Sequence, residues 1–370
     1  MIKEHSMKDR KESKLSLKEE KLEKIDKEIA KLRAEIAKKE IRLGDLEEHR
    51  AAVEASADGE VDDNLMKPGK VYSGYAGIPS GHASERIVRG CLVVEGGAFR
   101  GAYDSGVLDR LMTEDINLEC TIGVSAGALT GMNYVSGQIG RSARVNLGYR
   151  HDKRYVGLKP FRKEASIVGF SFLYDTYEEI EPFDMEWFKR RDHRFIAVVT
   201  NMLTGKAEFF ERGKCRSIKR AVKASASMPL VTRPTVMDGV PYLDGGCADK
   251  IPFDWALEQG FEKIIVIRTR EKEYRKKPVG AGEKRAMELL YHEYPEFLRT
   301  ALESNDMYNR QCDELDALAA AGRVLVLDPG TPVTVGRLES DMEKLGALYW
   351  QGYNETGERL DAIKEYLEIS

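Results

Sequence analysis

Two short apolar segments, each followed at once by a glycine-rich turn and a helix-compatible stretch, constrain the fold more than any other feature of the chain. The first is Cys91–Val94, which runs into Glu95–Gly101. The second is Cys120–Ile122, which runs into Gly123–Gly127. Strand, tight turn and helix in this order make up most of a βαβ unit, so the pattern predicts parallel strands covered by helices.

The same alternation continues toward the C-terminus. Further strands are predicted at Phe195–Thr200, Ala207–Phe210, Lys263–Arg268 and Val324–Leu327. Helices are predicted near Lys214–Ala226, Asp254–Gly260, Lys284–Leu302 and Asn305–Ala320. The tight-turn pair Asp238-Gly239 lies within Thr235–Asp244 and indicates one hairpin. We therefore predict an α/β fold in which a largely parallel sheet, interrupted by one hairpin, is covered on both faces.

Charge and cysteine usage narrow the class of protein. The chain of 370 residues has 58 Lys and Arg against 62 Asp and Glu, without the basic excess typical of nucleic-acid binding. Five scattered cysteines without a CxxC pair indicate reduced thiols, and they predict neither a disulfide framework nor a metal site. The first residues lack the apolar core of a secretory signal, and no apolar run is long enough to span a bilayer. We expect a soluble cytoplasmic protein.

Residues 1–54 predict one charged helix with a heptad pattern. Apolar side chains occupy most of the a and d positions between residues 15 and 46. In a parallel pair of such helices, four of the g-to-e pairs attract, among them Lys14–Glu19, and only Glu35–Glu40 repels. We therefore predict a parallel homodimeric coiled coil through residues 15–46. The alternative is a solvated charged helix that lies along its own chain.

The composition changes beyond this helix. Residues 55–88 are rich in Gly, Ser, Asp and Pro without a sustained period, which predicts a linker that becomes ordered on meeting the main domain. The α/β pattern begins at residue 89 and continues to about residue 270. Residues 271–370 have mainly helical patterns, and we expect this C-terminal part to pack on the α/β domain.

A pentapeptide of the form GxSxG follows the second predicted strand and contains Gly123, Ser125 and Gly127. A serine on a sharp strand-to-helix turn exposes its hydroxyl, because small neighbours let the backbone turn and let a substrate approach. The start of the following helix adds partial positive charge for a developing oxyanion. The motif predicts Ser125 as the nucleophile of a serine hydrolase. On its own it also fits a tightly packed turn with an incidental serine.

The upstream glycine loop, Glu95–Gly101, also lies between a strand and a helix. It is not a dinucleotide fingerprint, because Ala98 stands where that motif needs glycine, and no P-loop lysine follows. Unpaired N–H groups at a helix start can stabilise an anion. The oxyanion of acyl transfer needs such donors, each worth about 10²–10³ in rate. We predict an oxyanion-binding loop, with phosphate or ligand binding as the alternative.

The residue that activates the serine is less evident. Of the six histidines, two lie in the predicted coiled coil and one in the linker. His151, His193 and His292 have the polar surroundings of surface positions. Asp244 follows an apolar strand and precedes two glycines, so a carboxylate there can approach another group closely. Asp244 is therefore the candidate carboxylate base, the alternative being a histidine that the fold brings close to the serine. We assign Asp238 to the hairpin turn.

Three motifs in this order resemble the patatin-like phospholipase family, in particular its bacterial branch: EGGAFRG at 95–101, GVSAG at 123–127 and LDGG at 243–246. The resemblance runs from about Leu92 to Thr269, and part of the tail is also similar. It implies a three-layer α/β/α patatin-like fold, a catalytic domain over residues 89–270, and no metal or organic cofactor.

Carried over by position, the resemblance implies that Ser125 is the nucleophile and Asp244 the general base, in a dyad without histidine. It places the oxyanion loop on Gly97, Ala98 and Arg100. The glycines that shape the motifs are Gly96, Gly101, Gly123, Gly127 and Gly245. Alanine at position 98 departs from the family pattern and would be strained if the loop required a positive φ there. For Arg100 we expect the backbone to be the donor and the side chain to brace the loop.

The expected activity is hydrolysis of acyl esters in phospholipids, lysophospholipids or other lipids, through a covalent acyl-serine intermediate and with peripheral contact to a membrane. The alternative is a coiled-coil scaffold whose patatin-like domain binds lipid with little turnover. Aromatic residues within Ile167–Phe188 fit either an acyl groove or ordinary core, and we favour core. Basic residues between Arg268 and Lys277 could attract anionic headgroups, but the interleaved Glu271 and Glu273 favour a solvated face.

Overall fold

The structure is a computed structural model that describes residues 69–369. The predicted helix of residues 1–54, the dimer contact through residues 15–46 and the first part of the predicted linker lie outside the described residues.

A central sheet of eight strands organises the described part of the chain. Its strands are β2 (Val88–Val94), β3 (Leu118–Val124), β5 (Arg194–Asn201), β6 (Ala207–Glu211), β7 (Thr235–Met237), β8 (Val240–Asp244), β9 (Ile264–Ile267) and β10 (Leu325–Leu327). Strands β10, β9, β2, β3 and β5 are parallel neighbours in that order. The predicted hairpin is confirmed as β7–β8, which Asp238 and Gly239 connect with positive φ angles of 47° and 84°.

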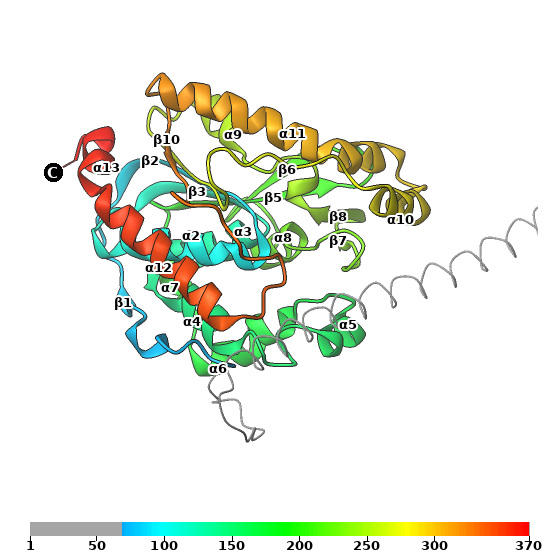
Figure 1. Ribbon diagram of the computed structural model, residues 1–370, viewed down its shortest axis with the longest axis horizontal. Helices are drawn as coiled ribbons and strands as arrows, with labels where there is room; N and C mark the ends of the chain where they lie inside the picture. Colours follow the sequence, from blue (N-terminus) through cyan, green and yellow to red (C-terminus); the bar gives the residue numbers. More distant parts are fainter. Residues whose placement is uncertain (1–68, 370) are drawn as a thin grey trace, which may run out of the picture.

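Helices cover both faces of this sheet and give three layers (Figure 1). One face packs against α2 (Gly101–Thr113), α3 (Ala126–Val135), α8 (Ile218–Ser225), α12 (Met342–Glu358) and α13 (Leu360–Leu367). The other packs against α9 (Phe253–Glu258) and α11 (Pro295–Ala320). Successive side chains of a strand point to opposite faces, so Leu92 and Val94 join the first core and Cys91 and Val93 the second. The prediction of a mostly parallel sheet in an α/β fold is confirmed.

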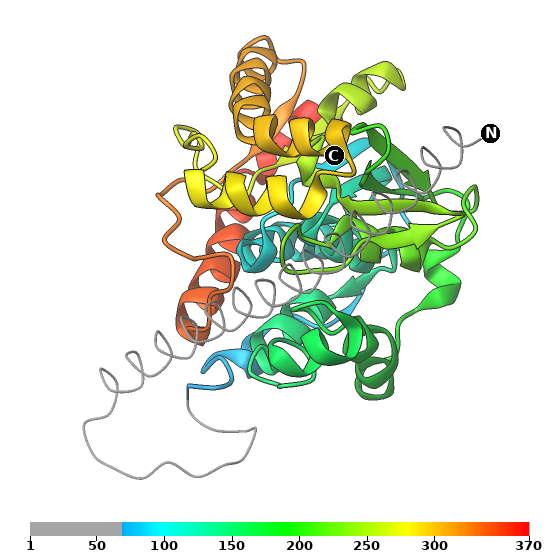
Figure 2. The same ribbon diagram turned by 90° about the vertical axis from the view of Figure 1, so that its right-hand side faces the viewer.

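A helical excursion joins β3 to β5 and forms one wall of the site described below. It contains α4 (Arg141–Tyr149), α5 (Leu158–Glu164), a π-helical turn (Phe172–Thr176), α6 (Tyr177–Ile180) and α7 (Met185–Phe188). A short antiparallel pair of β1 (Gly81–His82) and β4 (Gln138–Ile139) precedes it. In Figures 1 and 2 this excursion lies on the opposite side of the sheet from α10 (Ala281–Tyr291) and α11.

The C-terminal helices differ from the predicted ones at one boundary. The sequence patterns predicted helices near Lys284–Leu302 and Asn305–Ala320, but the chain breaks at residues 292–294 and then forms one helix of 26 residues. Pro295 is the cause, because proline begins a helix well and disfavours helical backbone in the residue before it. Tyr294 accordingly has φ −123° and ψ 68°.

Candidate active site

Ser125 sits in a strained turn between β3 and α3. Its φ of 56° and ψ of −122° lie in a region that side-chain-bearing residues rarely adopt. Its backbone N–H donates to Ser225 Oγ over 2.8 Å, which ties the turn to the end of α8. The turn needs glycine at position 127, where a Cβ would lie 2.4 Å from the carbonyl oxygen of Val94. Close packing of this kind holds the serine in its unusual conformation.

The pairing of β5 brings Asp244 to the serine. β6 occupies one edge of β5 from Ile196 to Thr200, so β3 and β8 must share the other edge. β3 pairs along it as far as Val198, which faces Val124, and β8 continues with Asp244 facing Val199. Because β3 is parallel and β8 antiparallel to β5, their C-terminal ends meet at this point. The residues that follow Val124 and end β8 are therefore neighbours in space.

The Ser125 hydroxyl donates a hydrogen bond of 2.6 Å to Asp244 Oδ2. The other carboxylate oxygen of Asp244 accepts the N–H of Gly246 over 2.8 Å, which fixes the orientation of the carboxylate. Both side chains are nearly buried, with exposed fractions of 9% for Ser125 and 7% for Asp244. Burial raises the pKa of the Asp244 carboxyl, while the hydrogen bonds from Ser125 and Gly246 act in the opposite direction. A carboxylate of raised basicity in contact with a hydroxyl can remove its proton.

The upstream glycine loop lies against the serine. A Cβ at Gly96 would lie 2.7 Å from Ser125 Cβ, so only glycine fits there. Among the described residues, the backbone N–H groups of Gly97 and Ala98 have no hydrogen-bond acceptor. The N–H of Arg100, in contrast, donates to the carbonyl of Gly97 over 3.2 Å. Gly97 and Ala98 line the same cavity as Ser125, and N–H groups without an acceptor are the donors that an oxyanion requires.

Two residues of this loop have unfavourable features: a positive φ at Ala98 and an unpartnered buried nitrogen at Arg100. Ala98 has a φ of 51°, the strained case for alanine. The Arg100 side chain is buried and, within residues 69–369, its Nε has no hydrogen-bond partner. The bracing contacts expected for that guanidinium are therefore not seen at Nε. Burial and the nearby Arg270 lower the pKa of Arg100 to about 10.

His193, the buried histidine of the described region, lies away from this pair. His193 is not a surface residue, as its polar neighbours in sequence suggested, but is buried with its ring beside Tyr134. It precedes the first residue of β5, at the end opposite to Ser125. Its Nε2 lies 3.4 Å from Thr121 Oγ1, while ring nitrogens of His151 and His292 lie close to the carbonyls of Ser340 and Leu289. A buried imidazole that neighbours arginine has a lowered pKa, about 3 for His193.

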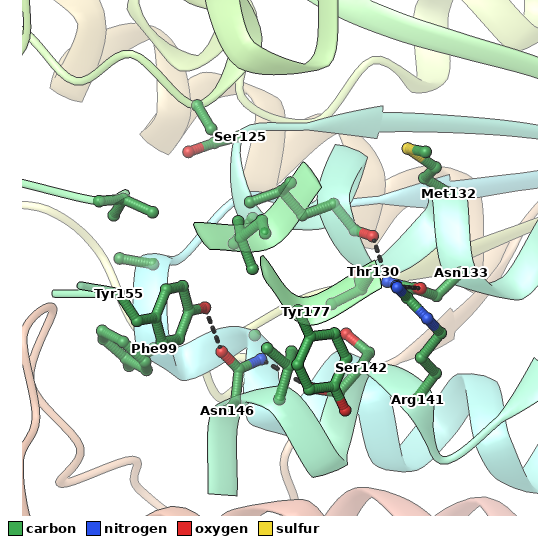
Figure 3. A pocket seen from close by; sticks show the side chains of 18 of the residues that line it. Phe99, Ser125, Thr130, Met132, Asn133, Arg141, Ser142, Asn146, Tyr155 and Tyr177 are labelled. Atoms are coloured by element: carbon green, nitrogen blue, oxygen red, sulfur yellow. Dashed lines mark hydrogen bonds between the residues drawn. The ribbon is translucent and has the colours of Figure 1, made fainter. Parts of the chain in front are cut away.

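An apolar cavity opens at Ser125 and runs under the helical excursion (Figure 3). Its apolar lining includes Phe99, Leu129, Met132, Val145, Tyr155 and Leu173. Figure 3 shows Ser125 at one side of the cavity and the pair Arg141–Asn133 at the opposite side, where the two side chains share a hydrogen bond of 2.9 Å. Of the aromatic stretch 167–188, Tyr174 lines the cavity, whereas Phe188 is packed in the core. The cavity has a volume of about 90 Å³ and offers the first part of an acyl chain an apolar environment next to the hydroxyl.

Comparisons with known proteins show which families the chain is similar to. The family model of the patatin-like phospholipases matches residues 92–257, which include both Ser125 and Asp244. Residues 92–257 are therefore similar to a patatin-like phospholipase domain over slightly less than half of the chain. A second family model, a domain of unknown function called DUF6363, matches residues 294–368, which follow the patatin-like domain and contain α11, α12 and α13.

Relatives match the patatin-like domain over a limited length. YjjU of Escherichia coli K12 is 28% identical over 183 residues, 48% of this chain and 51% of that protein. Lysophospholipase NTE1 of Scheffersomyces stipitis is 25% identical over 186 residues, 48% of this chain and 11% of that protein. The chain thus matches about half the length of YjjU. The crystal structure of VipD from Legionella pneumophila has a TM-score of 0.42 and 15% identity, covering 84% of this chain and 73% of that one.

Sequence reasoning missed several residues around the patatin-like site. Ser225 holds the backbone of Ser125, and Lys250 lines a second cavity at the serine. The sequence did offer a signal for Lys250, because this lysine follows Asp244 by only six positions, in the segment between β8 and α9. Within residues 69–369 no cluster of three or more His, Cys, Asp or Glu side chains could hold a metal ion. No helix in that range is long and apolar enough to cross a bilayer.

Proposed function

We propose that the patatin-like domain hydrolyses acyl esters of lipids, with Ser125 as the nucleophile and Asp244 as the general base. The observation that carries this proposal is the hydrogen bond of 2.6 Å between Ser125 Oγ and Asp244 Oδ2, at the mouth of an apolar cavity. The match to the patatin-like phospholipase family and the similarity to a protein named lysophospholipase support a lipid ester as the substrate.

The reaction proceeds in two steps. Ser125 Oγ attacks the ester carbonyl carbon while its proton passes to Asp244, and the carbonyl oxygen becomes an oxyanion held by the N–H groups of Gly97 and Ala98. The C–O bond to the alcohol breaks, and the alcohol leaves with the proton from Asp244. Water then attacks the acyl-serine and gives its proton to Asp244. The fatty acid leaves, and Ser125 Oγ recovers the proton.

Burial of Asp244 gives this mechanism its base. An ordinary aspartate is a weak acceptor for the proton of a hydroxyl, because their pKa values lie far apart. Desolvation raises the pKa of Asp244 and so narrows that gap. The hydrogen bond from Gly246 then limits the rise and keeps the carboxylate aimed at the serine.

Two further properties stay predictions beside this activity. Contact with a membrane surface follows from a lipid substrate and from no other observation on the described residues. The parallel dimer through residues 15–46 rests on the heptad pattern, and equal monomer masses in sedimentation with and without residues 1–50 would remove it.

The proposed activity is tested by labelling and turnover. The full chain should react with a fluorophosphonate probe and hydrolyse p-nitrophenyl esters of fatty acids. Ser125→Ala should abolish labelling, and both Ser125→Ala and Asp244→Asn should lower kcat/KM by about 10³-fold or more. Asp238→Asn, an exposed carboxylate in the β7–β8 turn, should stay within about twofold of wild type.

Two results would contradict the proposal. A wild-type protein that neither reacts with the probe nor hydrolyses an ester of any chain length is not this enzyme, and the scaffold alternative then gains support. Unchanged turnover in Asp244→Asn would remove Asp244 as the base.

A further inference from the structure

A second cavity meets Ser125 on the side away from the apolar cavity. It has a volume of about 530 Å³, which lies in the usual range for a small-molecule site. Both cavities are lined by Ala98, Ser125, Met228 and Leu338, so they join at the nucleophile. An ester bound with its carbonyl at Ser125 and its chain in the apolar cavity would direct its alcohol portion into this second cavity.

Four cationic side chains line the second cavity: Arg100, Lys250, Lys276 and Arg337. They come from separate parts of the chain, namely the oxyanion loop, the loop after β8, the loop before α10 and the loop before α12. Two carboxylates, Asp244 and Glu283, line the same cavity. We call the four cations together with the space they surround the cationic cavity.

None of these four cations forms an ion pair with a carboxylate among the residues that the structure describes. Neighbouring arginines of the predicted basic run do form such pairs. Arg268 contacts Asp316 at 3.2 Å and Asp328 more closely, and Arg275 contacts Asp313 at 2.7 Å. Arg268 and Arg275 outside the cavity are thus paired with carboxylates, whereas the four basic side chains that line it have no carboxylate partner within residues 69–369.

The lysines that line the cavity contact neutral groups, a backbone carbonyl and an aromatic ring, which stabilise a positive charge less than an anion would. The Lys250 ammonium donates to the carbonyl of Gly246. The Lys276 ammonium lies 4.2 Å from the centre of the Tyr308 ring. Arg100 has 8% of its surface exposed and an unpartnered Nε. Burial lowers the pKa of the Lys250 and Lys276 ammonium groups, because it disfavours their charged form. An anionic ligand between the basic side chains would stabilise that charged form.

The lining also indicates what kind of headgroup fits. The residues that line the cationic cavity include no Phe, Tyr or Trp. Quaternary ammonium groups such as choline are recognised by aromatic side chains around the cation, and a cavity rich in lysine and arginine repels them. Arginine and lysine are in contrast the residues that bind phosphate.

We propose that the cationic cavity binds a phosphate group on the alcohol portion of the substrate, so that the preferred substrate is an acyl ester whose headgroup ends in a free phosphate. This inference rests on the proposed function, because it takes Ser125 as the point where the ester is cleaved. The glycerol phosphate released by the first step then leaves from the cationic cavity, and the acyl chain stays in the apolar one.

Substrate preference gives the first test. The full chain is assayed with three oleoyl lipids that share the acyl chain: lysophosphatidate, lysophosphatidylcholine and monoacylglycerol. Wild type should hydrolyse lysophosphatidate with a kcat/KM at least about tenfold above either of the others. Lys276→Gln and Arg337→Gln should each lower the ratio of lysophosphatidate to monoacylglycerol turnover by about tenfold, because each variant removes a charged donor to the phosphate. Lys277→Gln, an exposed neighbour outside the cavity, should keep the wild-type ratio.

Binding gives a second test that does not need turnover. Glycerol 3-phosphate and inorganic phosphate are titrated into wild type, Lys276→Gln and Lys277→Gln by calorimetry. Wild type and Lys277→Gln should bind glycerol 3-phosphate with equal affinity, tighter than inorganic phosphate, and Lys276→Gln should bind it about tenfold more weakly. Preference for inorganic phosphate would assign the cavity to the free ion and overturn the headgroup proposal.

The outcomes separate this inference from the proposed function. Hydrolysis of all three lipids at equal kcat/KM, or an unchanged ratio in the two cavity variants, overturns the phosphate subsite and leaves the esterase intact. Absence of hydrolysis and of fluorophosphonate labelling overturns the esterase. In that case phosphate binding that is weakened by Lys276→Gln would still support an anion site.

Discussion

At the scale of single residues, the site depends on two backbones held in the left-handed region. Ser125 has a φ of 56° and Ala98 a φ of 51°, and both residues belong to turns that touch at Gly96. Such conformations cost about 1–3 kcal/mol each and persist where the surrounding structure leaves no alternative. For Ser125 the constraints are the hydrogen bond from its N–H to Ser225 Oγ and the close packing of Gly127 against the Val94 carbonyl.

Ala98 provides a test of whether this strain serves the oxyanion loop. Ala98→Gly removes the clash of Cβ at positive φ without moving the N–H, so kcat should equal or exceed that of wild type. Ala98→Val should lower kcat by about tenfold or more, because a β-branched residue opposes a positive φ and would displace the N–H. Steady-state turnover of p-nitrophenyl esters measures both effects.

A matched control separates strain from catalysis. Ala165 also has a φ of 51°, at the end of α5, away from the serine. Ala165→Gly should change the free energy of unfolding as Ala98→Gly does, within about 1 kcal/mol, and leave kcat unaltered. A lower kcat in Ala98→Gly would mean that the left-handed loop is not the active conformation.

At the scale of elements, α2 and α12 cross at unusually close range. A Cβ at Gly106 would lie 2.0 Å from the carbonyl oxygen of Tyr349, and one at Gly352 would lie 2.3 Å from that of Tyr103. The two helices belong to parts of the chain that different family models match, residues 92–257 and 294–368. Their crossing therefore fixes the C-terminal helices against the helix that begins at the oxyanion loop.

Alanine at these glycines should separate the two helices. Gly352→Ala places a Cβ against backbone that cannot rotate away, and we expect a loss of about 1–3 kcal/mol in the free energy of unfolding, measured by urea denaturation. Gly282→Ala in the first turn of α10 is the matched control. No atom lies within 4 Å of its added Cβ, so the better helix propensity of alanine should raise stability slightly. Equal effects at both positions would contradict the close crossing.

Sequence patterns predicted correctly those elements that depend only on neighbouring residues. The two strand–turn–helix units and the Asp238-Gly239 hairpin follow from glycines and apolar runs, and both appear in the structure. The boundary between α10 and α11 was predicted about ten residues too late, because the helical pattern of charged and apolar residues continues through it. Pro295 was the residue that indicated the correct boundary. His193 was misjudged because its neighbours in sequence are charged, while its burial comes from the Tyr134 ring of α3.

At the scale of the whole molecule, the site draws on segments that no local pattern connects. The motifs could locate Ser125 and Asp244, but not the edge of β5 on which β3 and β8 meet. The cationic cavity could not be predicted from sequence for the same reason. Its four basic residues are spread between residues 100 and 337, and only the tertiary fold brings them together. The sequence predicted Lys276 as part of a solvated basic run. In the structure Lys276 lines the cavity, whereas Arg268 and Arg275 of the same run pair with carboxylates.

A buried carboxylate joins three distant segments and should make stability depend on pH. Asp109 of α2 accepts the N–H of Gly140 over 2.8 Å and the hydroxyl of Tyr349 in α12 over 2.9 Å. Burial raises its pKa to about 7, against about 3.9 in an unfolded chain. Between these values the folded state binds the proton more tightly than the unfolded state. Stability from this group is therefore full below about pH 4 and is lost as the pH rises toward 7.

Asp109→Asn should remove this loss. Asparagine carries no charge, so the difference in unfolding free energy between the variant and wild type should shift in favour of the variant by up to about 3 kcal/mol from pH 4.5 to 8. Asp104 and Asp249, whose pKa values burial also raises, contribute equally to both proteins and cancel in the difference. Asp238→Asn reports the effect of an exposed carboxylate. Urea denaturation at several pH values measures the shift, and parallel curves for Asp109→Asn and wild type would show that Asp109 is ionised throughout.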